Sequence, residues 1–136
     1  AAIFLGECLN LFSESLNEFS NEVETNLEIS KAFATSYDKG HELILHNHGQ
    51  ALFSAMIYVD FDPTVHSPTV YKQPFNQFDS GNVCFRKFKT KEGDMMIVPS
   101  SIEHFSPANN SSKRKTVIGL DLIFAKNLGN ELKNND

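Results

Sequence analysis

Apolar residues near the N-terminus of the chain recur at alternating spacings of four and three, which is the period of one face of an α-helix. The stripe consists of Leu5, Leu9, Phe12, Leu16, Phe19, Val23 and Leu27. We therefore predict an N-terminal helix over residues 1–29, packed on the outside of a sheet. A coiled-coil dimerisation helix is the alternative, but two seam positions hold Phe and only about three heptads are available.

From residue 30 onward the chain consists of short β-rich runs separated by Gly, Pro, Asn and Asp. The predicted strands are Lys31–Tyr37, Glu42–His46, Phe53–Phe61, Thr69–Lys72, Val83–Phe88, Met95–Val98 and Thr116–Phe124. Because no helical periodicity separates them, we predict a mainly β fold, an antiparallel sandwich or barrel, with a jelly roll as the best architecture. We expect a single domain with a β-barrel core at 30–125 and a flexible tail at 126–136.

The composition then narrows the class of protein. A length of 136 residues suits one buried core. The chain has 12 Lys and Arg against 17 Asp and Glu, and this excess of negative charge disfavours a nucleic-acid partner. The basic cluster at 113–115 is too short to form a phosphate-binding surface. Cys8 and Cys84 form no metal-binding spacing, and no apolar run reaches the roughly 18–20 residues of a membrane span. No signal peptide is supported. We expect a cytoplasmic protein without a membrane partner, which could form a homodimer through the helical stripe or a sheet edge.

The histidines are the first candidates for chemistry. His46 and His48 lie two residues apart, so on a strand both can point into a barrel mouth and bind one metal ion, although paired surface histidines are the commoner case. His104 follows a short apolar strand that ends at Pro99 and Ser100, and it could supply a third ligand from a different strand. The alternative is a loop histidine in solvent.

A second candidate is the basic turn that opens the last strand. Arg114 is followed two residues later by Thr116, so the two side chains can point the same way and bind a carboxylate through the guanidinium and the hydroxyl. A solvated basic turn is the commoner outcome for such a cluster.

These features occur in an order that resembles a known family. The chain has His-x-His at 46–48, the run Ser-Ala-Met-Ile-Tyr-Val at 54–59, and Glu-Gly-Asp at 92–94 leading to Pro-Ser and Glu-His at 103–104. Asn109 and then Arg114 or Lys115 follow. This order resembles the small 2-oxoglutarate/Fe(II) oxygenases of bacteria and phages, over His46 to Leu122. The resemblance implies a double-stranded β-helix, a jelly-roll barrel with iron at one open end.

Carried over by position, the resemblance assigns Fe(II) binding to His46 and His104. His48 stands where the wider superfamily places Asp or Glu, so a set of three histidines is implied unless an acid such as Asp60 or Asp62 completes the site. Those acids could reach the metal only if the end of their strand curls inward.

The resemblance also implies a cation for the distal carboxylate of 2-oxoglutarate. Arg114 with Thr116 fits the family's Arg-x-Ser/Thr pairing, whereas the spacing from Asn109 puts Lys115 in register with the family's arginine. Only one of the two can face inward on a strand. We prefer Arg114, because Thr116 shares its face. Tyr58 is a further candidate contact to the cosubstrate.

The resemblance implies an Fe(II)- and 2-oxoglutarate-dependent dioxygenase that decarboxylates 2-oxoglutarate to succinate and hydroxylates a second substrate. That substrate could be a peptide side chain, a small metabolite or a modified nucleobase, with a small molecule or peptide favoured by the acidic charge. Two alternatives stay open. One is a cupin-like three-histidine metal protein that uses no 2-oxoglutarate, and the other is a non-catalytic β-sandwich module for binding or assembly.

Overall fold

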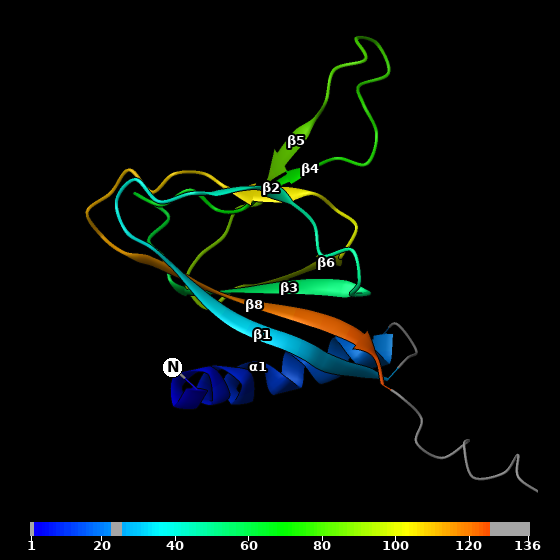
Figure 1. The fold of residues 1–136 in the computed structure, drawn as a ribbon, viewed down its shortest axis with the longest axis vertical. Coiled ribbons are helices and arrows are strands. Elements are labelled where there is room, and N and C mark those ends of the chain that lie inside the picture. The colour runs from blue at the N-terminus through cyan, green and yellow to red at the C-terminus, as the bar shows by residue number, and fades with distance from the viewer. Residues whose placement is uncertain (1, 23–25, 126–136) are drawn as a thin grey trace, which may run out of the picture.

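The computed structural model describes residues 2–22 and 26–125, so the expected flexible tail at 126–136 and Val23 of the helical stripe lie outside the described residues. Figure 1 shows the elements of this part of the chain. They are α1 (Ala2–Glu22), β1 (Leu27–Tyr37), β2 (Leu43–His46), β3 (Phe53–Asp60), β4 (Val70–Lys72), β5 (Phe85–Lys87), β6 (Met95–Pro99), β7 (His104–Ser106) and β8 (Lys115–Phe124). None of its helical segments has the length and apolarity that crossing a bilayer requires.

The strands form two four-stranded antiparallel sheets. The first has the order β1-β8-β3-β6 and the second the order β2-β7-β4-β5. Figure 1 shows the second sheet lying over the first, with α1 on the far side of the first sheet. The predicted mainly β jelly roll with a helix packed outside is therefore confirmed.

The structure differs from the prediction in two main ways, while the bounds of the strands after β1 differ by only one or two residues. The helix expected over 1–29 ends at Glu22 in the described residues, and β1 begins at Leu27, because Leu27 and Glu28 pair with Phe124 and Ile123 of β8. Strand β7 was not predicted, since three residues are too few to produce a recognisable alternation.

Strand β8 explains why the first sheet is buried on both faces. Its residues Ile118, Leu120 and Leu122 form a core with Ala55 and Ile57 of β3. Two α1 side chains, Phe12 and Leu16, pack against that core, and Phe19 meets Phe53 edge to face at 5.1 Å between ring centroids. The alternate residues of β8 face the second sheet, across the barrel interior. Burial on both faces is why this strand reads as an almost continuous apolar run.

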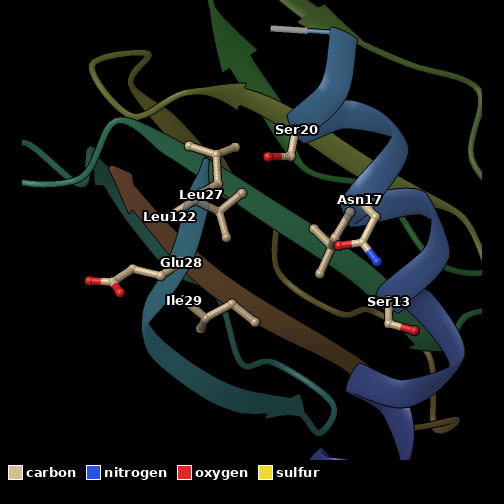
Figure 2. Close-up of a pocket in the computed structure, with 8 residues that line it drawn as sticks. Ser13, Asn17, Ser20, Leu27, Glu28, Ile29 and Leu122 are labelled. Carbon is tan, nitrogen blue, oxygen red and sulfur yellow. The ribbon is translucent and has the colours of Figure 1, made fainter. Parts of the chain in front are cut away.

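A cavity of about 340 Å³ lies between α1 and the start of β1, as Figure 2 shows. Its walls combine aliphatic side chains such as Leu16 and Ile29 with the hydroxyl and amide groups of α1. Among the described residues, no histidine, lysine or cysteine lines it and Glu28 is its one carboxylate, so it lacks the three converging ligands of a metal site.

The absence of a side chain at Gly119 shapes the barrel interior. Gly119 lies opposite Phe33 across the β1–β8 pair, and a Cβ atom at this position would overlap the Phe33 ring. That ring lies nearly parallel to the imidazole of His48, with 6.0 Å between centroids. The glycine therefore leaves the space in which Phe33 packs beside the histidine.

We predict that Gly119→Ala destabilises the protein by roughly 1–3 kcal/mol, because the methyl group forces Phe33 out of its position. The free energy of unfolding in urea measures this. Gly49→Ala is the matched control, since its Cβ would meet Asn47 Oδ1 at an ordinary 3.5 Å. Equal stability of the two variants would contradict the steric argument, and combining Gly119→Ala with Phe33→Ala should cost less than the sum of the two.

Candidate metal centre

Three predicted histidines meet at one end of the barrel. His46 on β2 and His104 on β7 are direct cross-strand partners, and their ring centroids lie 4.5 Å apart. His48 follows β2, and its backbone N–H donates to Ser100 O at 3.0 Å, which ties the loop to the end of β6. The potential ligand atoms of the three side chains lie within 4.8 Å of one another. His104 is buried and the other two are half-buried, so the group forms the inner wall of the open end.

Hydrogen bonds fix the orientation of each imidazole. His46 Nδ1 lies 2.8 Å from Ile44 O, and His104 Nδ1 lies 3.0 Å from Ile102 O. His48 Nδ1 lies 2.6 Å from Asp121 Oδ1. Because carbonyl and carboxylate oxygens only accept, each Nδ1 carries a proton, so in the neutral form of each ring the lone pair lies on Nε2. This is the arrangement that proteins use to present neutral imidazoles to a metal ion.

The electrostatic setting favours metal binding. Burial lowers the pKa of His104, and His46 and His48 lower it further, whereas Asp121 acts in the opposite direction. The imidazole of His104 is therefore neutral near pH 7 and available as a ligand. Asp121 supplies negative charge behind His48, where it supports a bound cation without occupying a coordination position.

The acids considered from the sequence do not reach the histidines. Strand β3 begins at Phe53, at the end of the barrel where the histidines lie, and runs away from them. Asp60, its last residue, is exposed and lies at the opposite end of the barrel. Asp62 Oδ2 accepts a bond from Lys113 Nζ at 2.6 Å. The strand end does not curl inward, and the acid that bonds one of the imidazoles is Asp121 on β8.

The two candidate cations lie on opposite sides of the barrel wall. Lys115 is 1% exposed, and its Nζ donates to Ser106 Oγ, lies 3.3 Å from Ser67 O and stands 4.3 Å from the centre of the Tyr37 ring. The side chain of Arg114 is 62% exposed, and its Nε donates to Asp38 Oδ1 at 2.8 Å.

The expectation that Arg114 and Thr116 face the interior is therefore not met. Thr116 Oγ1 lies 3.2 Å from Ser36 Oγ and shares the α1 side of β8 with Ile118, whereas Lys115 shares the inner face with Val117. The reason is the alternation of side chains along β8. Asp121 points inward, because it bonds His48, and Lys115 is an even number of residues away and so shares its face.

The surroundings of Lys115 contain no counter-ion. Within the described residues it forms no ion pair, and burial lowers its pKa to about 8. Burial also raises the pKa of Tyr37 and Tyr71, so these phenols stay protonated. Tyr58, the other predicted contact, is buried in the same cluster, where its Oη accepts from Thr69 N at 3.1 Å. An unpaired buried ammonium is costly, and an anion would relieve that cost.

One cavity connects the histidines with the surroundings of Lys115. It lies between the sheets and is lined at one end by the three imidazoles and at the other by Tyr37 and Ser106, which both contact Lys115. Outside the histidines, an open groove of about 710 Å³ runs past Lys31, Phe33 and Gln50. The inner cavity has a volume of only about 40 Å³, so an anion beside Lys115 requires the surrounding side chains to move apart. The arrangement offers a cation site at the barrel mouth and room for a further molecule in the groove.

We predict that Asp121→Asn weakens metal binding by about 10–100-fold, because the amide no longer supplies negative charge to His48. Titration of the purified protein with Fe(II) or Co(II) measures this. Asp60→Asn removes an exposed acid and should leave the affinity unchanged. Equal affinities of both variants would show that Asp121 does not support the metal.

No protein-family model matches this sequence, and no curated protein matches it significantly. Solved structures do resemble it. HygX from Streptomyces hygroscopicus, solved with nickel and 2-oxoglutarate bound, aligns over 93% of this chain and 69% of its own, with a TM-score of 0.66 and 14% identity. A prolyl-4-hydroxylase from Pseudomonas putida aligns over 82% of this chain and 63% of its own, with a TM-score of 0.58 and 12% identity.

A third structure is an oxidoreductase of the 2OG-Fe(II) oxygenase family from Burkholderia pseudomallei. It aligns over 73% of this chain and 46% of its own, with a TM-score of 0.57 and 11% identity. This chain thus spans less than two thirds of the length of the last two proteins. At these identities the likeness is one of fold, and together with the two facing sheets it shows that the chain is a jelly-roll barrel of the double-stranded β-helix type.

Proposed function

We propose that the protein is an Fe(II)- and 2-oxoglutarate-dependent oxygenase. The observation that carries the proposal is the content of a single cavity. Three imidazoles converge at its mouth, and within the described residues an ammonium group without a counter-ion lies beyond its inner end. A metal ion and a dicarboxylate together satisfy both ends.

The three histidines fit Fe(II). Imidazole nitrogen is a suitable ligand for this metal, and a site with ligands on one side leaves positions open for other molecules. His46, His48 and His104 would hold the ion through Nε2, because each Nδ1 is already bonded to an oxygen. When bound, Fe(II) would supply the redox chemistry by which 2-oxoglutarate and O₂ are consumed and a C–H bond is hydroxylated.

The inner end of the cavity fits one carboxylate of 2-oxoglutarate. Lys115 would bind it in place of the arginine expected from the sequence, with the Ser106 hydroxyl and the Tyr37 phenol beside it. Tyr58 lines the surrounding buried cluster rather than the cavity wall, so its proposed role is to support this end. The HygX structure with nickel and 2-oxoglutarate bound has the same fold, which supports the choice of cosubstrate.

The remaining residues would position the reactants and keep water out. Asp121 holds His48 in one orientation, and the Phe33 ring covers the face of that imidazole. Lys115 keeps its proton throughout, because its role is to balance charge. The second substrate, a small molecule or a peptide, would lie in the open groove beside Lys31 and Gln50.

A second candidate is a three-histidine metal enzyme of the cupin type that uses no 2-oxoglutarate. The observation that favours it is His48, which points with His46 and His104 at one centre while the nearest acid, Asp121, bonds to His48 instead. The two candidates share the metal and differ in what Lys115 does.

We predict that Fe(II) stabilises the protein and that 2-oxoglutarate adds a second increment, each about 2.7 kcal/mol at a concentration 100 times its dissociation constant. Anaerobic thermal unfolding measures both, and succinate formation in air measures turnover. His46→Ala or His104→Ala should remove both increments, because the second depends on the metal. Lys115→Ala should keep the iron increment and lose that of 2-oxoglutarate.

Arg114→Ala is the control for Lys115→Ala, since it removes a neighbouring cation that points to solvent. It should retain both increments and the production of succinate. If the wild type binds iron but shows no 2-oxoglutarate increment and forms no succinate, the three-histidine alternative is correct. If Lys115→Ala keeps its response to 2-oxoglutarate, Lys115 does not bind the carboxylate. If the wild type binds no metal, the protein is a non-catalytic module and both candidates fail.

The pH dependence of the free energy of unfolding reports on the buried ammonium group of Lys115. Because the pKa of Lys115 falls from 10.5 to about 8 on folding, the unfolded chain binds more protons above pH 8. The cost of the buried ammonium is therefore fully present below about pH 8 and is relieved as the pH rises.

We predict that the ligand-free protein gains on the order of 2 kcal/mol relative to Lys115→Met between about pH 8 and pH 10. Urea denaturation of both proteins at several pH values measures the difference. Above pH 10 the buried phenols of Tyr37 and Tyr71 oppose the gain in both proteins, because folding raises their pKa values. Parallel pH profiles for the two proteins would show that Lys115 does not carry a buried charge.

A further inference from the structure

The β4–β5 connection, strand β5 and the segment after it form an arm, residues 73–91, which the proposed oxygenase site does not use. Figure 1 shows the β4–β5 connection extending away from both sheets. Tyr71 of β4 pairs with His104 on one side and with Arg86 on the other. The β4–β5 connection therefore leaves the barrel at the end where the histidines lie, whereas the segment after β5 runs back toward Gly93 and Asp94, whose backbones bond to Tyr58 of β3.

The arm concentrates positive charge on an acidic protein. Arg86, Lys87, Lys89 and Lys91 are four of the 12 Lys and Arg of the chain, and Asp79 is the one acid among residues 73–91. All four cations are exposed, and within the described residues none of them forms an ion pair. The expectation against a nucleic-acid partner rests on the net charge of the whole chain, which is negative, whereas the arm by itself is positively charged.

The same arm carries exposed aromatic rings. Four of the five exposed phenylalanines of the described residues lie on it: Phe75, Phe78, Phe85 and Phe88. Phe75 is 69% exposed and Phe78 is completely exposed. Phenylalanine rings in water are unfavourable, and a group of them marks a binding surface.

The base of the arm is anchored while its aromatic loop is free of ring contacts. Phe85 meets Phe105 edge to face at 5.7 Å, and Phe88 meets Tyr71 at the same distance. Within the described residues, no ring contact involves Phe75 or Phe78. Alternation along β5 places Lys87 on the face of Phe85 and Arg86 on the face of Phe88, so each anchored ring has a cation beside it.

We propose that the arm binds single-stranded nucleic acid. Cations interleaved with exposed aromatic rings are the chemistry that such a ligand requires, because the cations contact phosphates and the rings stack on unpaired bases. A lipid surface fits less well, since the loop that would insert also carries Asp79 and the amides of Gln77 and Asn82. The binding is independent of the proposed metal chemistry and needs neither iron nor 2-oxoglutarate.

The first test is titration of the metal-free full chain with fluorescein-labelled oligothymidylate. Four phosphate contacts predict that affinity falls about 50-fold between about 50 and 200 mM salt. The triple variant Arg86→Gln, Lys87→Gln, Lys89→Gln should lose most of the affinity and show a weaker salt dependence. The matched control is Lys39→Gln, Lys113→Gln, Arg114→Gln, which removes the same charge away from the arm and should bind like the wild type.

The second test separates stacking from charge. Phe75→Ala with Phe78→Ala should weaken binding about tenfold or more with an unchanged salt dependence, because the rings contact bases and not phosphates. Phe124→Ala removes an exposed ring at the end of β8 and should have no effect. These variants alter exposed loop positions, so circular dichroism should show the wild-type fold.

Three outcomes would overturn the proposal. One is equal loss of affinity in the arm variant and its charge-matched control. Another is equal or tighter binding of a duplex of the same length, because paired bases cannot stack on the rings. The third is the absence of oligothymidylate binding together with arm-dependent binding to anionic phosphatidylserine vesicles, which would assign the arm to a lipid surface.

Discussion

The alternation of side chains along β8 is the constraint on which the rest of the structure depends. One face of the strand places Ile118, Leu120 and Leu122 in the core under α1. The other face places Lys115 and Asp121 in the barrel interior. Because β8 lies between β1 and β3, a slip of one residue would expose the aliphatic side chains to the cavity and bury both charges under the helix. The register of β8 therefore determines both the packing of the first sheet and the charged groups of the cavity.

The same strand explains what could be predicted from the sequence. His46 and His104 could be found, because a pair two residues apart and a histidine after a Pro-Ser strand end are local patterns. The apolar pattern could not separate Lys115 from Arg114, since a strand that is buried on both faces shows no alternation between apolar and polar residues. The spacing from Asn109 did favour Lys115, but we gave more weight to the pairing of Arg114 with Thr116. Asp121 was also missed, although a lone acid inside that apolar run is a signal in retrospect.

The barrel separates its charges along the cavity. The carboxylate of Asp121 is compensated by the N–H of His48, while the ammonium of Lys115 lies near neutral oxygens and an aromatic ring. A low-dielectric interior tolerates the first arrangement far better than the second. The interior thus has an unmet preference for an anion, and the cavity between Lys115 and the histidines limits where that anion can lie.

The pairing of β1 with β8 also determines when the cavity can exist during synthesis of the chain. Leu27 pairs with Phe124, so the contacts that close the first sheet join residues from opposite ends of the described sequence. Contacts of such large sequence separation form slowly, because the loop between them must be ordered first. The carboxylate that orients His48 and the buried ammonium both arrive with this last strand. Until β8 has left the ribosome and docked, the emerging histidines have no enclosed cavity around them.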